Sequence, residues 1–312
     1  MNIANQAPRL RDLGQRVDKR LRRAGVALVA KKFVEDGHYY SPVPALDDVR
    51  ARDGAIFAIP TSVPGIDLQL DEQLELVRAF GAYYNEQSFP AVEMPDYRYF
   101  YKNNFFGFGD AIMLYSMIRH EPPARIFEIG SGFSSAVMLD TLERFSLDNV
   151  ACTFVDPDPV RIRALFRAGD HDKHEVVTDP VQNMDLGRFD ELQSGDILFI
   201  DSSHVTKVGS DVNHLFFHVL PRLAKGVRVH VHDVYYPFEY PKPWVYEGRA
   251  WNEAYLLRAL LTDNKRLKVL LWNSCLEKLA RVETVTTLPM WGTEPGGSIW
   301  LRVQTDADAA AS

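Results

Sequence analysis

Short apolar runs alternate with amphipathic segments over the C-terminal two thirds of the chain. Seven such runs predict β-strands, at Arg125–Ile129, Ala151–Val155, Glu175–Thr178, Asp196–Ile200, Val227–His232, Leu267–Trp272 and Ser298–Val303. Helical spacing predicts helices at Phe133–Phe145, Pro159–Arg167, Lys207–Leu223 and Asn252–Leu261. Strands that alternate with helices indicate βαβ units and a mostly parallel sheet, and runs with little polar alternation indicate strands covered on both faces. The last two runs have no long helix between them, which favours an antiparallel final strand.

The first hundred residues lack this rhythm. Residues 41–64 are rich in Pro, Asp and Gly, which indicates loops, and Asp71–Tyr84 has the spacing of a helix. We therefore expect three parts. Residues 1–100 form a helical and loop extension that acts as a lid or recognises a substrate. Residues 101–304 form an α/β domain with a doubly wound, seven-stranded sheet and helices on both faces, and residues 305–312 form a disordered tail.

Composition narrows the class of protein. The two cysteines, Cys152 and Cys275, are not in a CxxC pair, which argues against a disulfide framework and a cysteine zinc site. No apolar run approaches the ~20 residues that a membrane span needs, and no leader pattern opens the chain. These features predict a cytoplasmic protein, and they do not indicate an oligomeric state.

Charge is unevenly distributed along the chain. Residues 1–34 contain nine Lys or Arg and two Asp, which gives this segment a charge of +7. Because the net charge of the chain is −7, the remaining residues together carry −14. An acidic main body argues against a nucleic-acid partner. The basic start has apolar residues at helical spacing, which fits a helix on an anionic membrane or partner, or a solvated helix that packs on its own protein. The second interpretation is favoured, because the basic amphipathic pattern alone is a weak signal.

A glycine turn between the first predicted strand and helix carries the candidate chemistry. Gly130 allows a tight turn, Gly132 allows close approach of a ligand to the backbone, and Ser134 and Ser135 stand where hydroxyls cap a helix. Asp156 follows the second strand, where a carboxylate accepts hydrogen bonds from ribose hydroxyls. Its alternative role is to begin an Asp-Pro turn.

Glu128 indicates which nucleoside the turn would hold. An acid two residues before Gly130 disfavours a dinucleotide pyrophosphate and favours the cationic amino group of S-adenosylmethionine. The alternative is a strand-end residue that caps local backbone groups.

These residues resemble a known family. The run Glu128-Ile-Gly-Ser-Gly-Phe-Ser-Ser135, with Asp156 after the next strand, is similar to the first two motifs of class I S-adenosylmethionine-dependent methyltransferases. The runs at 199–204 and 229–234 resemble the macrocin-type and catechol-type O-methyltransferases, and the resemblance covers about residues 100–304. It implies S-adenosylmethionine as cofactor, with Asp179 near the adenine. The predicted cofactor-binding residues are Glu128, Gly130, Ser131, Gly132, Ser134, Ser135, Asp156 and Asp179.

Two acids end neighbouring predicted strands. Asp201 follows the fourth strand and Asp233 the fifth, so we expect both at the carboxyl edge of the sheet, with a cation such as Mg²⁺ between them. The resemblance implies a divalent metal at the same place. The sequence departs from it, because Val234 stands where catechol-type enzymes have Asn and His232 stands where macrocin-type enzymes have an acid. His232 is therefore the candidate third ligand.

Methyl transfer to an alcohol requires a group that takes the hydroxyl proton. His204, three residues after Asp201, is the candidate base, and Asp201 the second catalytic candidate. The aromatic stretches Tyr97–Phe108 and Tyr235–Trp244 are expected to flank the acceptor. The predicted function is O-methylation of a hydroxylated small molecule, such as a sugar or glycosylated metabolite. An NAD-linked oxidoreductase on the same architecture and a non-catalytic binding module are the alternatives.

Overall fold

The computed structural model describes residues 32–304, and the chain divides into two compact units, 1–53 and 54–312. The described part of the first unit contains α2 (Leu46–Ala51), and α3 (Asp53–Ile56) spans the boundary. The predicted basic N-terminal helix and the predicted disordered tail lie outside the described residues. Among residues 32–304, no helix combines the length and apolar character that crossing a membrane requires.

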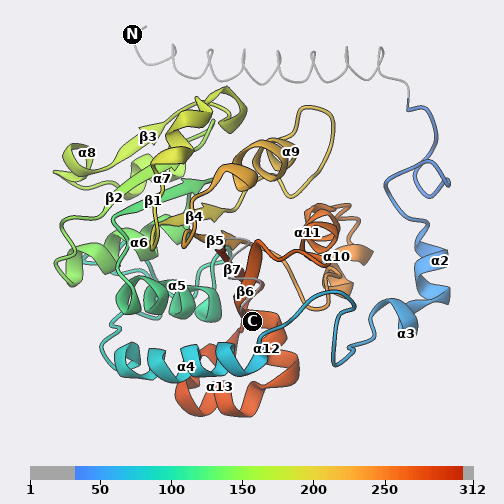
Figure 1. The fold of residues 1–312 in the computed structure, drawn as a ribbon, viewed down its shortest axis with the longest axis horizontal. Helices are drawn as coiled ribbons and strands as arrows, with labels where there is room; N and C mark the ends of the chain where they lie inside the picture. Colours follow the sequence, from blue (N-terminus) through green and yellow to red (C-terminus); the bar gives the residue numbers. More distant parts are fainter. Residues whose placement is uncertain (1–31, 305–312) are drawn as a thin grey trace, which may run out of the picture. The chain divides into compact units, whose positions relative to one another are not determined.

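The second unit is built on one seven-stranded sheet (Figure 1). Its strands are β1 (Arg125–Ile129), β2 (Ala151–Val155), β3 (Glu175–Val177), β4 (Ile197–Ile200), β5 (Arg228–Val231), β6 (Leu267–Trp272) and β7 (Ile299–Val303). Their order is β3-β2-β1-β4-β5-β7-β6, and β7 alone runs antiparallel to its neighbours. The predicted doubly wound, mostly parallel sheet and its antiparallel last strand are confirmed.

Helices cover both faces of this sheet. The helices of this unit after α3 are α4 (Leu70–Tyr84), α5 (Phe108–His120), α6 (Phe133–Arg144), α7 (Val160–Leu165), α8 (Asp170–Lys173), α9 (Asp211–His214), α10 (Lys242–Tyr246), α11 (Glu253–Leu261), α12 (Asn273–Leu279) and α13 (Arg281–Thr287). The helix predicted at 207–223 is composite, because α9 continues through a π-helical turn and a 3₁₀ turn to Arg222. The connection between β6 and β7 contains α12 and α13, which the sequence did not indicate.

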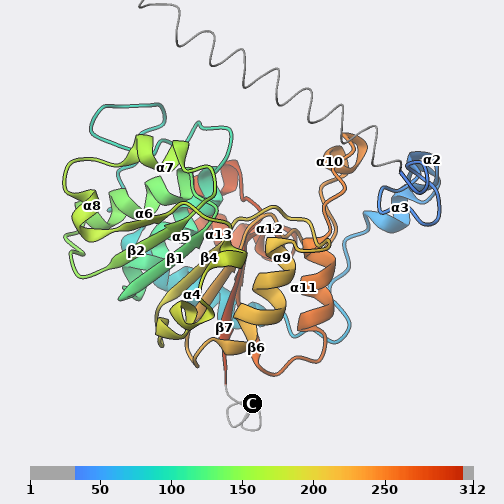
Figure 2. The same cartoon turned by 90° about the horizontal axis from the view of Figure 1, so that it is seen from above.

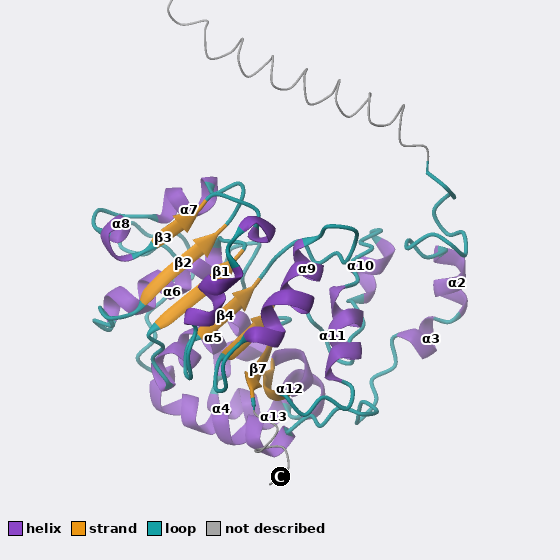
Figure 3. Ribbon diagram, turned by 45° about the horizontal axis from the view of Figure 1, so that its top comes forward, coloured by secondary structure: helices purple, strands orange, loops and turns teal. Residues whose placement is uncertain are grey.

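Alternate strand residues define two cores. Phe127 and Ile129 of β1 pack on one face with residues of α9 and α11, whereas Ile126 packs on the other with residues of α5 and α6. Figures 2 and 3 show α9 and α11 on one side of the sheet and α4, α5 and α13 on the other. Apolar residues on both faces of the strands explain why the runs lack polar alternation.

Helix α4 is an integral part of the second unit. The Gln73 side chain accepts a hydrogen bond from Trp272 N at 2.7 Å and donates one to Leu68 O at 2.6 Å. The Tyr115 hydroxyl of α5 donates to Tyr83 O at 3.1 Å. The boundary predicted near residue 100 therefore falls inside a compact unit that begins at Gly54.

Candidate functional site

A cavity of about 570 Å³ lies at the carboxyl ends of β1, β2 and β4. Residues predicted as cofactor-binding or catalytic line it, together with side chains from the loops after β2 and β3. The lining includes Gly130, Ser131, Asp156, Arg161, Gln182 and Asp201. Ligands of open α/β sheets bind at this edge, so the cavity is the candidate site.

Gly130 directly follows β1 and lies against the backbone of Asp201, which directly follows β4. Its φ is +80°, and a Cβ at this position would lie 1.9 Å from Asp201 O. Gly130 N donates to Val155 O, and Asp201 N donates to Ile129 O, both at 2.9 Å. The turn is therefore tied to both neighbouring strands, and only glycine fits it.

Glu128 lies beneath the turn and is fully buried. The hydroxyls of Ser134 and Ser135 both donate to its carboxylate, and the Ser135 hydroxyl accepts a hydrogen bond from Gly132 N at 2.9 Å. Burial raises the pKa of Glu128 to about 8, against the opposing effect of the serine hydrogen bonds. Glu128 is absent from the cavity lining, so in this structure it supports the loop from below.

Asp156 faces the cavity and also shapes the backbone. One carboxylate oxygen accepts hydrogen bonds from Ser131 N at 3.1 Å and Ser131 Oγ at 2.9 Å, and the other accepts from Asp158 N at 2.8 Å. Asp156 therefore shapes the turn and also lines the cavity, and its binding of ribose hydroxyls stays a prediction.

Asp179 lies outside the cavity lining. It is exposed and accepts a hydrogen bond from Asn183 Nδ2 at 2.9 Å. Pro180, Val181 and Gln182 line the cavity at this side instead. The contact of Asp179 with an adenine stays a prediction.

His204 lies between two strand-end acids and a third acid from α11. Its Nε2 is 3.3 Å from Asp201 Oδ1 and 3.9 Å from Asp233 Oδ2, and its Nδ1 is 3.0 Å from Glu253 Oε2. The structure thus brings together the predicted Asp201, Asp233 and His204, and adds Glu253, which the sequence did not indicate.

The acids around His204 determine its charge. Burial alone would lower the pKa of His204, but hydrogen bonds to Asp201 and Glu253 raise it to about 10. A ring whose two nitrogens both face carboxylates donates from both, which requires the imidazolium form. Burial alone would raise the pKa of Asp201, yet His232, His204 and Arg161 together lower it.

Glu253 is brought to His204 by the backbone. The His204 carbonyl accepts hydrogen bonds from Asn252 N at 3.1 Å and Glu253 N at 3.2 Å, at the start of α11. His204 itself has a φ of +57°, and its ring lies 4.4 Å from that of Trp251. The signal in the sequence was limited to an acid in the first turn of a predicted helix.

The predicted metal ligands do not form a metal cluster in this structure. His232 is buried, its Nε2 is 3.7 Å from Asp233 Oδ1, and its ring contacts those of Phe106 and His230. Between residues 32 and 304, no three His, Cys, Asp or Glu side chains are grouped so as to hold a metal ion. His204 lies within 4 Å of both strand-end acids, where the predicted cation was expected.

The two aromatic stretches differ in their placement. Tyr99, Tyr101 and Phe106 are buried in the core. In the other stretch, the Tyr235 and Trp244 rings lie 5.3 Å apart, and Trp244 contacts Trp251, the neighbour of His204, at 5.4 Å. Tyr236, Phe238 and Tyr240 of this stretch are buried as well, and Phe105 of the first stretch is exposed, so flanking of an acceptor by either stretch stays a prediction.

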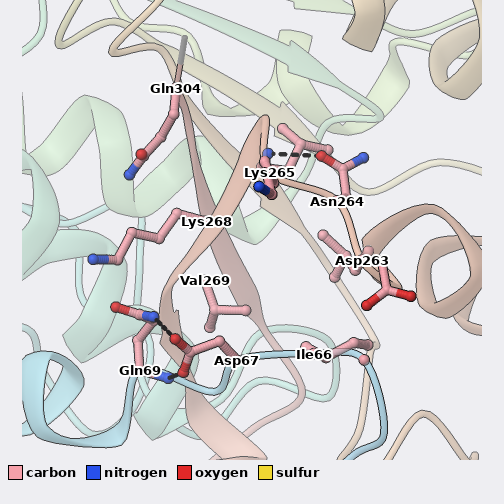
Figure 4. A pocket seen from close by; sticks show the side chains of 12 residues that line it. Ile66, Asp67, Gln69, Asp263, Asn264, Lys265, Lys268, Val269 and Gln304 are labelled. Carbon is pink, nitrogen blue, oxygen red and sulfur yellow. Dashed lines mark hydrogen bonds between the residues drawn. The ribbon is translucent and has the colours of Figure 1, made fainter. Parts of the chain in front are cut away.

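A second cavity, of about 360 Å³, lies at the edge strand β6 (Figure 4). Asp67, Gln69, Asn264 and Lys268 line it, and the Gln69 side chain is hydrogen-bonded to Asp67. None of the predicted site residues lines this cavity.

Comparison with known proteins identifies a methyltransferase domain in the part of the chain that contains the cavity. Residues 127–234 match the family model described as a methyltransferase domain. An uncharacterized protein of Archaeoglobus fulgidus is 36% identical over 171 residues, which cover 52% of this chain and 75% of that protein. The matched family segment runs from β1 to the residue after Asp233, and so contains the strand ends that form the cavity.

Solved structures similar to this chain are more distant. The CmcI-D160 structure with Mg-SAM is 16% identical, covers 83% of this chain and 96% of its own, and has a TM-score of 0.40. A methyltransferase from Geobacter sulfurreducens is 21% identical, covers 54% of this chain and 80% of its own, and has a TM-score of 0.25.

Proposed function

The chain belongs to the methyltransferase-domain family, and on that premise we propose that it transfers the methyl group of S-adenosylmethionine to a hydroxyl oxygen of a small molecule. The observation that carries this proposal is the cavity where Gly130, Asp156 and Asp201 meet. At one edge of the sheet the cavity brings together a glycine turn that allows close approach, an acid in position to bind a ribose, and a catalytic candidate.

The donor would be held by the loops after β1 and β2. Asp156 Oδ1 accepts one hydrogen bond, from Asp158 N, and would accept a second from a ribose hydroxyl, whereas Oδ2 already accepts two from Ser131. Glu128 would act indirectly, because it holds Ser134 and Ser135 and thereby fixes the loop that approaches the donor. S-adenosylmethionine supplies an activated methyl group, so the protein's task is to orient the acceptor and accept its proton.

We propose that Asp201 is the base that takes the hydroxyl proton of the acceptor. Its carboxylate lines the cavity, with a third of its side chain exposed, and it is held ionised by the cations around it. His204 would stabilise the negative charge of the Asp201 carboxylate as a fixed imidazolium, since an ionised donor strengthens a hydrogen bond. The sequence indicated His204 as the base, but a base must first lose a proton that three acids hold in place.

A divalent cation does not fit the described side chains in this arrangement. An imidazolium next to Asp201 and Asp233 already supplies positive charge there and would repel Mg²⁺. We therefore propose no step that uses a metal.

The acceptor is proposed to carry a ring with an apolar face as well as a hydroxyl. Tyr235, Trp244 and Trp251 are ring neighbours beside His204, and the Tyr235 hydroxyl lies 3.4 Å from Asp233 Oδ1. Aromatic faces next to polar groups suit a sugar or a glycosylated metabolite, which presents CH groups on one face and hydroxyls at its edge.

Calorimetric titration with S-adenosylmethionine tests the donor site. Asp156→Ala should weaken binding about tenfold or more, because hydrogen bonds to a charged group are lost. Asp158→Ala is the matched control, since that acid contributes its backbone N–H and is absent from the cavity lining. Equal affinity of both variants would remove the ribose assignment. Binding of NADH without any response to S-adenosylmethionine would decide for an oxidoreductase.

A further inference from the structure

Arg161 is a cavity residue that the proposed chemistry leaves without a role. It is the second residue of α7, five positions after Asp156, and its side chain lies across the glycine turn. A Cβ added to Gly132 would be 3.0 Å from an Arg161 Nη atom and 3.1 Å from its Cδ. Gly132 has an extended backbone, with φ 176°, so the absence of a side chain there leaves space for the arginine.

The Arg161 guanidinium is supported on one side by aromatic rings. Its Cζ lies 4.3 Å from the centre of the Phe105 ring, and Phe105 stacks on Phe133 at 5.9 Å with 10° between the planes. Within residues 32–304, no carboxylate forms an ion pair or hydrogen bond with Arg161. The planar fork is therefore oriented, and its donors remain available for a ligand.

The charges of the cavity lining indicate which chemical group of a ligand would bind Arg161. The lining contains the acids Asp156, Asp201 and Asp211, which suit hydroxyls and cations but repel a carboxylate. The proposed donor has a ribose, a sulfonium, an ammonium and one carboxylate. That carboxylate requires a cation close to the glycine turn.

The lining contains two cationic side chains, Arg161 on the segment after β2 and Lys207 on the segment after β4. Arg161 packs on the Gly132 turn and is close enough to contribute to the lowered pKa of Asp201. Lys207 precedes Gly209, whose carbonyl accepts a hydrogen bond from Gln182 Nε2 at 3.0 Å, on the side formed by the loops after β3 and β4. If the ribose binds Asp156 and the methyl group faces Asp201, the amino-acid part lies at Arg161.

We propose that Arg161 binds the carboxylate of the donor's amino-acid part through its guanidinium fork. This inference rests on the proposed function, because it assigns a part of the S-adenosylmethionine molecule. A bidentate arginine–carboxylate pair fixes both position and direction, and it would hold the amino-acid part while the reacting carbon faces the acceptor.

Two ligands that differ only in the carboxylate test the inference. The full chain is titrated with S-adenosylhomocysteine and with its decarboxylated analogue, S-adenosyl-3-thiopropylamine, by calorimetry. The wild type should prefer S-adenosylhomocysteine by about tenfold to a hundredfold, the range for hydrogen bonds between charged groups. Arg161→Gln should reduce this preference to about one, and Arg161→Lys should retain part of it, because charge persists without the fork.

Lys207→Gln is the matched control, a cationic lining residue on the segment after β4, and it should retain the wild-type preference. An Arg161→Gln protein that weakens both ligands equally, or neither, overturns the inference, as does a variant that changes the KM of the acceptor alone. If the wild type binds neither ligand, the proposed function fails as well, which separates the two outcomes. Unchanged circular dichroism and melting of Arg161→Gln confirm that the variant is folded.

Discussion

The glycine turn after β1 gives the sharpest prediction, for the substitution Gly130→Ala. The residue has a φ of +80°, a region that costs an L-residue about 1–2 kcal/mol. The new methyl group would also lie 1.9 Å from Asp201 O and 2.9 Å from Asp201 C. Both atoms belong to backbone at the end of β4, which cannot rotate away as a side chain can.

The expected loss follows from these two contributions. Overpacking in a close-packed interior costs about 1–3 kcal/mol, so together with the strained φ we expect a decrease of about 2–5 kcal/mol in the free energy of unfolding. The hydrogen bond Asp201 N–Ile129 O, which joins the ends of β1 and β4, would have to lengthen as these strand ends separate. Binding of S-adenosylhomocysteine should fall in parallel, because the same displacement moves the cavity wall.

Gly169→Ala provides the control for backbone strain. Gly169 has a φ of +90°, but a Cβ there would meet nothing within 4 Å, so it carries the left-handed cost without the steric overlap. Urea unfolding followed by circular dichroism, with calorimetry on the same samples, compares the two variants. If Gly130→Ala destabilises the protein no more than Gly169→Ala does, close approach of β1 and β4 is not the reason for glycine at this turn.

Three further predictions concern the buried charges. Under saturating substrates, methyl transfer should stay level from about pH 6 to 9 and decline as His204 loses its proton near the pKa of about 10, whereas a rate that climbs tenfold per pH unit would make His204 the base. Because burial raises the pKa of Glu128 to about 8, the stability that its protonated form provides is complete below the unfolded pKa of about 4.5 and is lost as the pH rises through 8. The wild type should therefore lose about 3 kcal/mol relative to Glu128→Gln between pH 5 and 8 in urea titrations, and parallel curves would contradict the buried acid. Chelation with EDTA should leave methyl transfer unchanged, and Mn²⁺ should give the electron paramagnetic resonance spectrum of the free ion, whereas a bound-ion spectrum would restore the metal.

The sheet could be predicted from the sequence because burial on both faces leaves uninterrupted apolar runs. Each predicted run contains a strand, and the ends of β1, β2 and β6 match the structure. The segment between β6 and β7 was harder, since α12 and α13 are seven residues each and the second contains three threonines and two valines, which are weak helix formers. Helix α4 was detected, but its membership in the second unit depends on tertiary contacts such as that of Gln73 with Trp272.

The sequence predicted residues of the cavity lining only where they follow a strand. Gly130, Asp156 and Asp201 follow strands and therefore meet at one edge of a parallel sheet. Glu128 also belongs to a strand, but its side chain points to the α5/α6 face, so the position that suggested a ligand contact places it under the serines. Arg161 had no signal, because an arginine in a first helical turn is common and its direction depends on the space left by Gly132.

The positions of Asp201 and Asp233 at neighbouring strand ends predicted a metal, and nothing in the sequence indicated that Glu253 would face His204 beside them. Two strand-end acids at Asp201 and Asp233 require a compensating positive charge, and a divalent ion and an imidazolium both satisfy that requirement. The choice depends on the other nitrogen of His204, which faces Glu253, an acid 49 positions later in the chain. Glu253 is almost fully buried, and in the described part of the chain its Oε1 has no hydrogen-bond partner, so the ion pair with His204 is its main compensation. Removing the proton from His204 would leave Glu253 without its ion-pair partner and would weaken the compensation of Asp201 and Asp233, so the three acids together favour the protonated ring.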